Sequence, residues 1–240
     1  MENFNDIGIS SKLDFPRIKK LLFIGIIASL LHLVGDFILG WGVEDETQEG
    51  ILRLFSAYIS TSDGGIFAAA ILGLFGMVLE GLSMFGIYRL MAEKSPKCAH
   101  GYRSGILGYL MFGACGYHVP FCAVTFLLKH GFAGELVLKY ALYFIIPAFI
   151  LFWIFFLALS ISQISAFAKG YTPYPKFAWI FCLPIGMLIA VLIGLIGNYA
   201  FNNAVFCAFL AIGNLWTFVG LLLMLKKAEN NHLKQFKENE

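Results

Sequence analysis

Six long apolar runs, separated by short charged segments, constrain this chain more than any other feature of its sequence. They lie at about residues 21–41, 66–90, 104–128, 137–165, 177–198 and 205–225. Each is long enough to cross a hydrocarbon core of roughly 30 Å. Backbone groups in lipid must be hydrogen-bonded within their own segment, so each run is expected to be a helix. The mean hydropathy is +0.79. The chain is therefore predicted to be one all-α domain, residues 1–240, that forms a polytopic membrane helix bundle with six transmembrane helices.

The lysines and arginines lie almost entirely on one side of this predicted bundle. Fourteen of the 17 fall in the two termini and in the connections after the second and fourth runs, whereas Arg53, Lys129 and Lys139 fall on the other side. Cytoplasmic loops of membrane proteins carry such an excess. We therefore expect a multi-pass plasma-membrane protein with both termini in the cytoplasm. The net charge of +2 gives no indication of a nucleic-acid partner.

The connection at 42–65 is the longest, and it is acidic. Its centre, 51–59, groups apolar residues at roughly helical spacing but is too short and too charged to cross a bilayer. A short interfacial helix on the outer face, between the first two spans, is the prediction. A lid over an outward-facing cavity is the functional alternative.

Two histidines and two acidic residues lie deep inside the apolar runs: His32 and Asp36 in the first, Glu80 in the second and His118 in the third. An acidic residue at the bilayer centre costs about 2.5–3.5 kcal/mol, so such groups usually pair, face a cavity or carry function. His32 and Asp36 are four residues apart and share a helix face. At 1.5 Å per residue, all four lie at overlapping depths. They are predicted ligand-binding residues, together with Asn214 of the sixth run.

Small and polar residues continue the helix faces that carry these groups. At α-helical spacing, the stripes through His32, Glu80 and His118 are extended respectively by Gly25, Ser29 and Gly40; by Gly73, Gly76 and Ser83; and by Cys115, Cys122 and Thr125. Three helices are thus predicted to turn a narrow polar stripe toward the interior of the bundle. Prolines are expected to kink three of the helices, at Pro120, Pro147 and Pro184.

Three functions are open for this polar group. The first is binding or transport of a small polar ligand, a cation or a lipid in an outward-facing intramembrane cavity, with no cofactor expected. The second is a metal-dependent intramembrane hydrolase. Two histidines and a carboxylate form a known catalytic zinc set, so His32, Asp36 and His118 would hold zinc. Glu80 would then act as the general base on the metal-bound water.

The third function is a non-enzymatic membrane scaffold, in which the polar side chains only brace the helices. No G-x-S-x-G motif and no phosphate-binding glycine loop occur in the sequence, so no other chemistry is indicated. The sequence therefore leans toward a protein that is not an enzyme, with membrane lipids as its expected partners.

Three short motifs resemble an uncharacterised bacterial family of six-span integral membrane proteins. The run Val34-Gly35-Asp36-Phe37-Ile38-Leu39-Gly40 resembles the G-D motif of that family, and Gly116-Tyr117-His118 resembles a motif of its third span. The stretch 63–88 is similar to its second span. The resemblance covers about residues 21–128. It implies a six-span membrane protein and supports Asp36 and His118 as site residues, but it implies no particular reaction.

Overall fold

The computed structural model describes residues 13–237, which form helices joined by short connections, with no strand in that range. The α-helices are α1 (Phe15–Gly40), α2 (Gly50–Ile59), α3 (Asp63–Ala92), α4 (Pro96–Gly108), α5 (Val119–Lys129), α6 (Gly134–Tyr140), α7 (Ile146–Ala168), α8 (Leu183–Gly194), α9 (Ala200–Cys207) and α10 (Phe209–Lys237). Two π-helical segments, η1 (Tyr109–His118) and η2 (Ala141–Ile145), and a 3-10 helix, η3 (Lys176–Phe181), lie between them. The predicted all-α class is confirmed.

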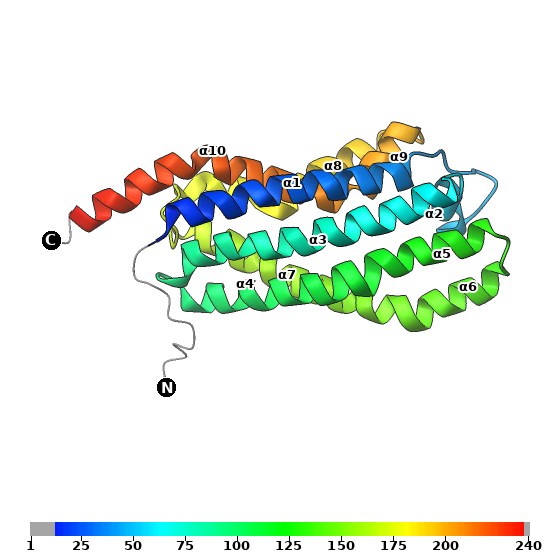
Figure 1. The fold of residues 1–240 in the computed structure, drawn as a ribbon, viewed down its shortest axis with the longest axis horizontal. Coiled ribbons are helices and arrows are strands. Elements are labelled where there is room, and N and C mark those ends of the chain that lie inside the picture. The colour runs from blue at the N-terminus through cyan, green and yellow to red at the C-terminus, as the bar shows by residue number, and fades with distance from the viewer. Residues whose placement is uncertain (1–12, 238–240) are drawn as a thin grey trace.

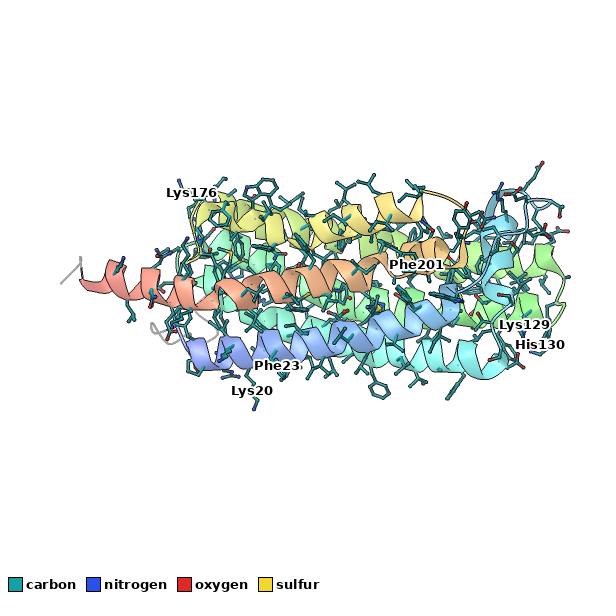
Figure 2. All side chains as sticks on the ribbon, turned by 90° about the horizontal axis from the view of Figure 1, so that it is seen from above. Lys20, Phe23, Lys129, His130, Lys176 and Phe201 are labelled. Carbon is teal, nitrogen blue, oxygen red and sulfur yellow. The ribbon has the colours of Figure 1, made fainter. Side chains whose placement is uncertain are left out.

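The long helices run side by side along one axis. The first residues of α1 and the last of α10 lie at the same end of the bundle, and α2 and α6 lie at the other end (Figure 1). Lys20 and Lys176 lie toward the first end, whereas Lys129 and His130 lie at the second (Figure 2). The ends of the bundle are called the α10 end and the α2 end below.

Five helical stretches of residues 13–237 are long and apolar enough to cross a membrane. They are Phe15–Gly40, Asp63–Ala92, Pro96–Lys129, Gly134–Ala168 and Phe209–Lys234. These stretches correspond to the first four predicted runs and to the sixth. Each is longer than its predicted run, because polar flanking residues continue the helix past the apolar segment.

The fifth apolar run is not the continuous helix predicted at 177–198. The 3-10 helix η3 ends at Phe181, Cys182 has an extended backbone (φ −74°, ψ 147°), and α8 follows with 12 residues. Pro184 lies in the first turn of α8, where a missing N–H is tolerated. The kink expected at Pro184 is therefore replaced by a break before it. Mean hydropathy does not distinguish one long helix from two short ones.

The sixth run also begins differently from its prediction at 205–225. The α-helix α9 ends at Cys207, Ala208 leaves the helical conformation (φ −86°, ψ 14°), and α10 begins at Phe209. At the other side α10 continues to Lys237. Eight of the 12 residues at 226–237 are Lys, Ala, Glu, Leu or Gln, which are good helix formers in water.

Both π-helical segments end just before a proline. η1 ends at His118 and η2 at Ile145, so that Pro120 and Pro147 lie in the first turns of α5 and α7. A proline cannot donate to the carbonyl four residues earlier, and the i→i+5 pattern of a π-helix replaces the i→i+4 pattern at that point. The helices therefore continue through these prolines, and the kinks expected there stay a prediction.

Helices α1 and α3 pack closely because glycines line their contact. A Cβ added at Gly35 on α1 would lie 3.1 Å from the Ala69 carbonyl oxygen of α3. A Cβ added at Gly76 on α3 would lie 2.7 Å from His32 Cβ. The predicted face of α3 therefore meets α1 at Gly76, and this brings the polar residues of both helices together. The predicted glycines of α1, Gly25 and Gly40, face α10 and α9 instead.

A helix forms in the long connection, as predicted, and covers the α2 end of the bundle. Phe55 and Tyr58 of α2 are buried against α5, with the Phe55 and Phe121 rings stacked at 5.0 Å. The preceding loop is tied to the α8–α9 connection: Asn198 Oδ1 accepts from the Glu44 backbone N–H, and Asn198 Nδ2 donates to the Glu44 carbonyl oxygen. These contacts hold α2 over the interior of the bundle.

The hydrogen bonds in the loop before α2 can be tested through the pKa of Asp45. The Thr47 hydroxyl and backbone N–H donate to Asp45 Oδ1 at 2.7 and 2.9 Å. These bonds stabilise the carboxylate and hold the pKa of Asp45 below its ordinary value. We expect Thr47→Val to raise that pKa toward the ordinary value and Thr47→Ser to leave it low, as measured by the pH dependence of the Asp45 carboxyl chemical shift.

The sign of the effect follows from the direction of the pKa shift. Because the pKa of Asp45 is lowered in the folded chain, the loop contacts of Asp45 add stability above its unfolded-state pKa. That contribution is lost as the pH falls through the folded-state pKa. An unchanged pKa in Thr47→Val would contradict the assignment of the hydroxyl as its cause.

Candidate functional site

The residues singled out in the sequence are buried in one region of the bundle. His32 and Asp36 lie on α1, Glu80 on α3, His118 at the last residue of η1 and Asn214 on α10, and none exposes more than 7% of its surface. The first four contact one another directly, and Asn214 joins them through one further side chain. The sequence-based expectation that three helices share one polar region therefore holds in the structure.

His32 lies between two carboxylates. Its Nδ1 is 3.1 Å from Glu80 Oε2, and its Nε2 is 3.2 Å from Asp36 Oδ2. A neutral imidazole donates from only one nitrogen. If both contacts are hydrogen bonds, two protons must be shared among the three groups. The imidazole is thus fixed in orientation from both sides.

His118 is oriented by the backbone of α3. Its Nε2 is 3.1 Å from the carbonyl oxygen of Ala69, which can only accept, so Nε2 carries a proton. In the neutral ring the lone pair is then on Nδ1, which lies 3.8 Å from Asp36 Oδ1. Two electron-pair donors therefore face each other at a separation that is too long for a hydrogen bond.

A tyrosine that the sequence reasoning missed connects this group to α10. The Tyr109 hydroxyl donates to Glu80 Oε2 at 2.6 Å, and Asn214 Nδ2 donates to the Tyr109 oxygen at 3.0 Å. The chain of contacts from Asn214 through Tyr109, Glu80 and His32 to Asp36 links four helical segments. Glu80 Oε2 therefore holds two partners, while Glu80 Oε1 has no hydrogen-bond partner among the described residues.

The π-helical register of η1 explains both the tyrosine and one wrong prediction. Tyr109 and His118 are nine residues apart, which is 2.5 turns of an α-helix and would put them on opposite faces. The wider π-helix has more residues per turn, so nine residues make about two turns and both side chains point inward. Cys115 was predicted to share the face of His118, but it is exposed, because this register rotates it outward.

A cavity of about 110 Å³ opens beside the histidines. His32, Asp36 and His118 form its polar side, and its other walls are mostly aromatic and aliphatic. Leu54 and Tyr58 of α2 contribute to the lining, so the cavity lies toward the α2 end of the bundle. Glu80 and Asn214 do not line it. Glu80 contacts His32, which faces the cavity, whereas Asn214 is connected to that histidine only through Tyr109 and Glu80.

The three cavity-facing groups have the composition and spacing of a metal-ligand set. One ligand atom from each of His32, Asp36 and His118 lies within 4.8 Å of the others. Two nitrogen or oxygen ligands of a tetrahedral zinc ion, each about 2.0–2.2 Å from the ion, are about 3.3–3.6 Å apart. The three groups therefore have to draw closer together for all of them to reach one ion.

The fold and the site together define a class: an all-helical protein whose long helices fit membrane spans and enclose a cluster of histidines and carboxylates. The chain belongs to a family of unknown function (DUF6796), whose sequence pattern matches residues 3–228. The match covers nearly the whole chain, whereas the resemblance seen in the sequence covered its first half. No curated protein and no solved structure matches the chain significantly.

Proposed function

We propose that this protein is a multi-pass membrane protein that binds one divalent transition-metal ion, of the zinc type, in its buried cavity. The ligands are His32 Nε2, the Asp36 carboxylate and His118 Nδ1. Nitrogen and carboxylate ligands of this kind suit zinc and its first-row neighbours. Three protein ligands leave a fourth position on the ion open toward the cavity.

One observation carries this proposal: each histidine is held by its other ring nitrogen. His32 Nδ1 contacts Glu80 Oε2 at 3.1 Å, and His118 Nε2 contacts the Ala69 carbonyl oxygen at 3.1 Å. Metal-ligating histidines almost always donate their second N–H to a carboxylate or a backbone carbonyl, which fixes the tautomer and the ring orientation. Here the two remaining nitrogens both face the same carboxylate, that of Asp36.

The contacts of Glu80 do not favour the role of general base. Its Oε2 contacts His32 on the side away from Asp36 and also accepts from Tyr109. A base for metal-bound water must reach that water within about 2.6–3.2 Å, and Glu80 does not line the cavity. We assign to Glu80 the role of orienting the His32 ring, which increases the affinity of the site for the metal.

The distribution of basic residues supports an orientation for the proposed membrane protein. Most of the described lysines and arginines belong to the α10 end, as Lys20 and Lys176 show (Figure 2), and the positive-inside rule puts that end in the cytoplasm. The cavity then lies in the outer half of a plasma-membrane bundle. In this arrangement η3 and α8 make the fifth of six crossings, and α2 lies at the outer surface.

The test is metal content per chain. Detergent-purified protein without a histidine tag is stripped with a chelator, reloaded with Zn²⁺, washed and measured by elemental mass spectrometry. We expect about one zinc per chain in the wild type and less than a tenth of that in His118→Ala and in Asp36→Asn. The exposed His130, which pairs with Asp63 at 3.1 Å, supplies the matched control: His130→Ala should keep its zinc.

Two results would overturn the proposal. One is a wild-type protein that takes up no zinc after loading. The other is equal zinc in wild type and folded His118→Ala, which would place the ion elsewhere. Either result would leave the cluster as a hydrogen-bonded brace between α1, α3 and η1.

A further inference from the structure

The wall of the cavity between α7 and the α9–α10 pair is made mainly of side chains. Helix α7 packs against α4, η1 and η3, whereas α9 and α10 pack against α1 and α8. Across residues 13–237, α7 packs far less closely against α9 and α10 than against α4 and η1. The two groups meet through aromatic rings, of which Trp153 on α7 and Phe209 on α10 are stacked at 6.4 Å with an interplanar angle of 10°.

Four aromatic residues form the rim of the cavity on this side: Phe149, Trp153, Phe206 and Phe209. Each lines the cavity and is half-buried. Beside them on α7, Ile150 and Ile154 are 53% and 55% exposed. Because α7 is part of a helix that fits a membrane span, this surface faces lipid in the proposed membrane protein. The rim thus separates the cavity from lipid rather than from water.

The volume of the cavity sets the size of what it holds. The cavity volume of about 110 Å³ is several times the roughly 10–15 Å³ of cavity space that one water molecule needs, so the cavity takes a small polar head group and not a whole lipid. The rest of a lipid-sized molecule has to pass between the rim residues and remain in the hydrocarbon. Phenylalanine and tryptophan rings suit such contacts, since they give large apolar surfaces.

The charge of the proposed centre selects the kind of head group. The two positive charges of the metal ion are balanced by two carboxylates, those of Asp36 and of Glu80, which contacts His32. The net charge of the proposed centre is therefore zero. A charge that is buried without a partner is costly. A neutral oxygen donor, such as a hydroxyl or a carbonyl, therefore completes the fourth position at lower cost than a carboxylate or a phosphate.

From these observations we propose that the cavity binds a neutral, single-chain amphiphile that reaches it sideways from the membrane. Its hydroxyl or carbonyl oxygen faces His32, Asp36 and His118, and its chain lies between α7 and α9–α10. This inference rests on the proposed metal site, which supplies the charge balance. It adds the chemical class of the ligand and the route by which the ligand arrives.

The test uses a monoacylglycerol that carries a photoactivatable diazirine in its chain and an alkyne for enrichment. Zinc-loaded protein in lipid nanodiscs is illuminated, and labelled positions are located by peptide mass spectrometry. We expect labelling at the rim residues of α7 and α9–α10, reduced at least tenfold by excess unlabelled monoacylglycerol. An otherwise identical fatty-acid probe should label the rim at least fivefold less.

Variants of α10 supply the matched comparison. Leu210 lines the cavity, whereas Leu223 is 79% exposed on the same helix. Leu210→Trp should reduce rim labelling at least fivefold, and Leu223→Trp should leave it unchanged. If Leu210→Trp does not fold, Phe206→Trp at the rim replaces it, with the exposed Phe201→Trp of the same helix as its control.

Zinc content measured on the same samples separates the two proposals. Labelling that spreads evenly over the lipid-facing helices, without competition and without an effect of Leu210→Trp, overturns the amphiphile site even where zinc is bound. Stronger labelling by the fatty acid overturns the neutral head group. A wild-type protein that binds no zinc overturns the metal site. If rim labelling in that protein is still reduced by unlabelled monoacylglycerol, only the proposed route from the membrane into the cavity is retained.

Discussion

Replacement of Gly73 by alanine is expected to abolish high-affinity metal binding although residue 73 is not a ligand. Gly73 lies on α3 opposite the His118 imidazole, and a Cβ added there would overlap that ring. The ring would have to turn, because α1 and α3 are too closely packed for the backbone to move instead. Turning it breaks the contact between His118 Nε2 and the Ala69 carbonyl oxygen and moves Nδ1 away from Asp36.

The expected loss is large because it affects the orientation of a ligand. Removing the partner that orients a metal-ligating side chain typically costs 10- to 100-fold in affinity, and we expect Gly73→Ala to weaken Zn²⁺ binding by about 100-fold, at the upper end of that range. Overpacking should also cost about 1–3 kcal/mol of stability. Zinc affinity is measured by competition with a chromophoric chelator, and stability by thermal unfolding in detergent.

The same helix offers a control for this substitution. Gly64 lies in the first turn of α3, and a Cβ added there would meet no atom within 4 Å. Gly64→Ala should therefore bind zinc as the wild type does. Wild-type zinc affinity in a folded Gly73→Ala protein would contradict the assignment of His118 as a ligand, since that ring cannot keep its position beside an added methyl group.

The residues on α1 and α3 could be predicted from the sequence because both helices keep the α-helical period throughout. His32, Asp36 and Glu80 have the depth and the direction that 1.5 Å and 100° per residue give them. The glycines that extend their stripes, such as Gly76, are buried as expected. Where the backbone follows the regular helix, residue spacing is enough to find the site.

The third membrane-length stretch, Pro96–Lys129, shows why the remaining parts of the site could not be predicted from the sequence. His118 was found because an ionisable residue in an apolar run is conspicuous, but Tyr109 was not, since α-helical spacing puts it on the opposite face. The π-helical register has no clear signal in the sequence apart from Pro120 two residues later. The Ala69 carbonyl is a backbone group and is the same in every residue type. No side chain identifies it as the partner of His118.

Removal of the Glu80 carboxylate is expected to cause the largest loss of stability of any substitution in the cluster. Glu80 is fully buried, and its Oε2 accepts from Tyr109 at 2.6 Å and contacts His32 Nδ1 at 3.1 Å. Glu80→Ala leaves His32 and Tyr109 without that acceptor and opens a void beside them. Breaking a buried pair by deleting one member costs about 3–5 kcal/mol. We expect a loss of that size in the free energy of unfolding, measured by denaturant titration in mixed micelles.

Two further variants divide this loss between structure and metal binding. Glu80→Gln retains an oxygen that accepts from Tyr109 and His32, so it should keep most of the stability, yet bind zinc about 10- to 100-fold more weakly because the negative charge behind His32 is gone. Glu135 has a side chain that is 82% exposed and pairs with Lys139, so Glu135→Ala should change the stability by less than about 0.5 kcal/mol. Glu80→Ala with wild-type stability would show that the carboxylate does not brace α3 against α1 and η1. Unchanged zinc affinity in Glu80→Gln would show that it does not orient a ligand either.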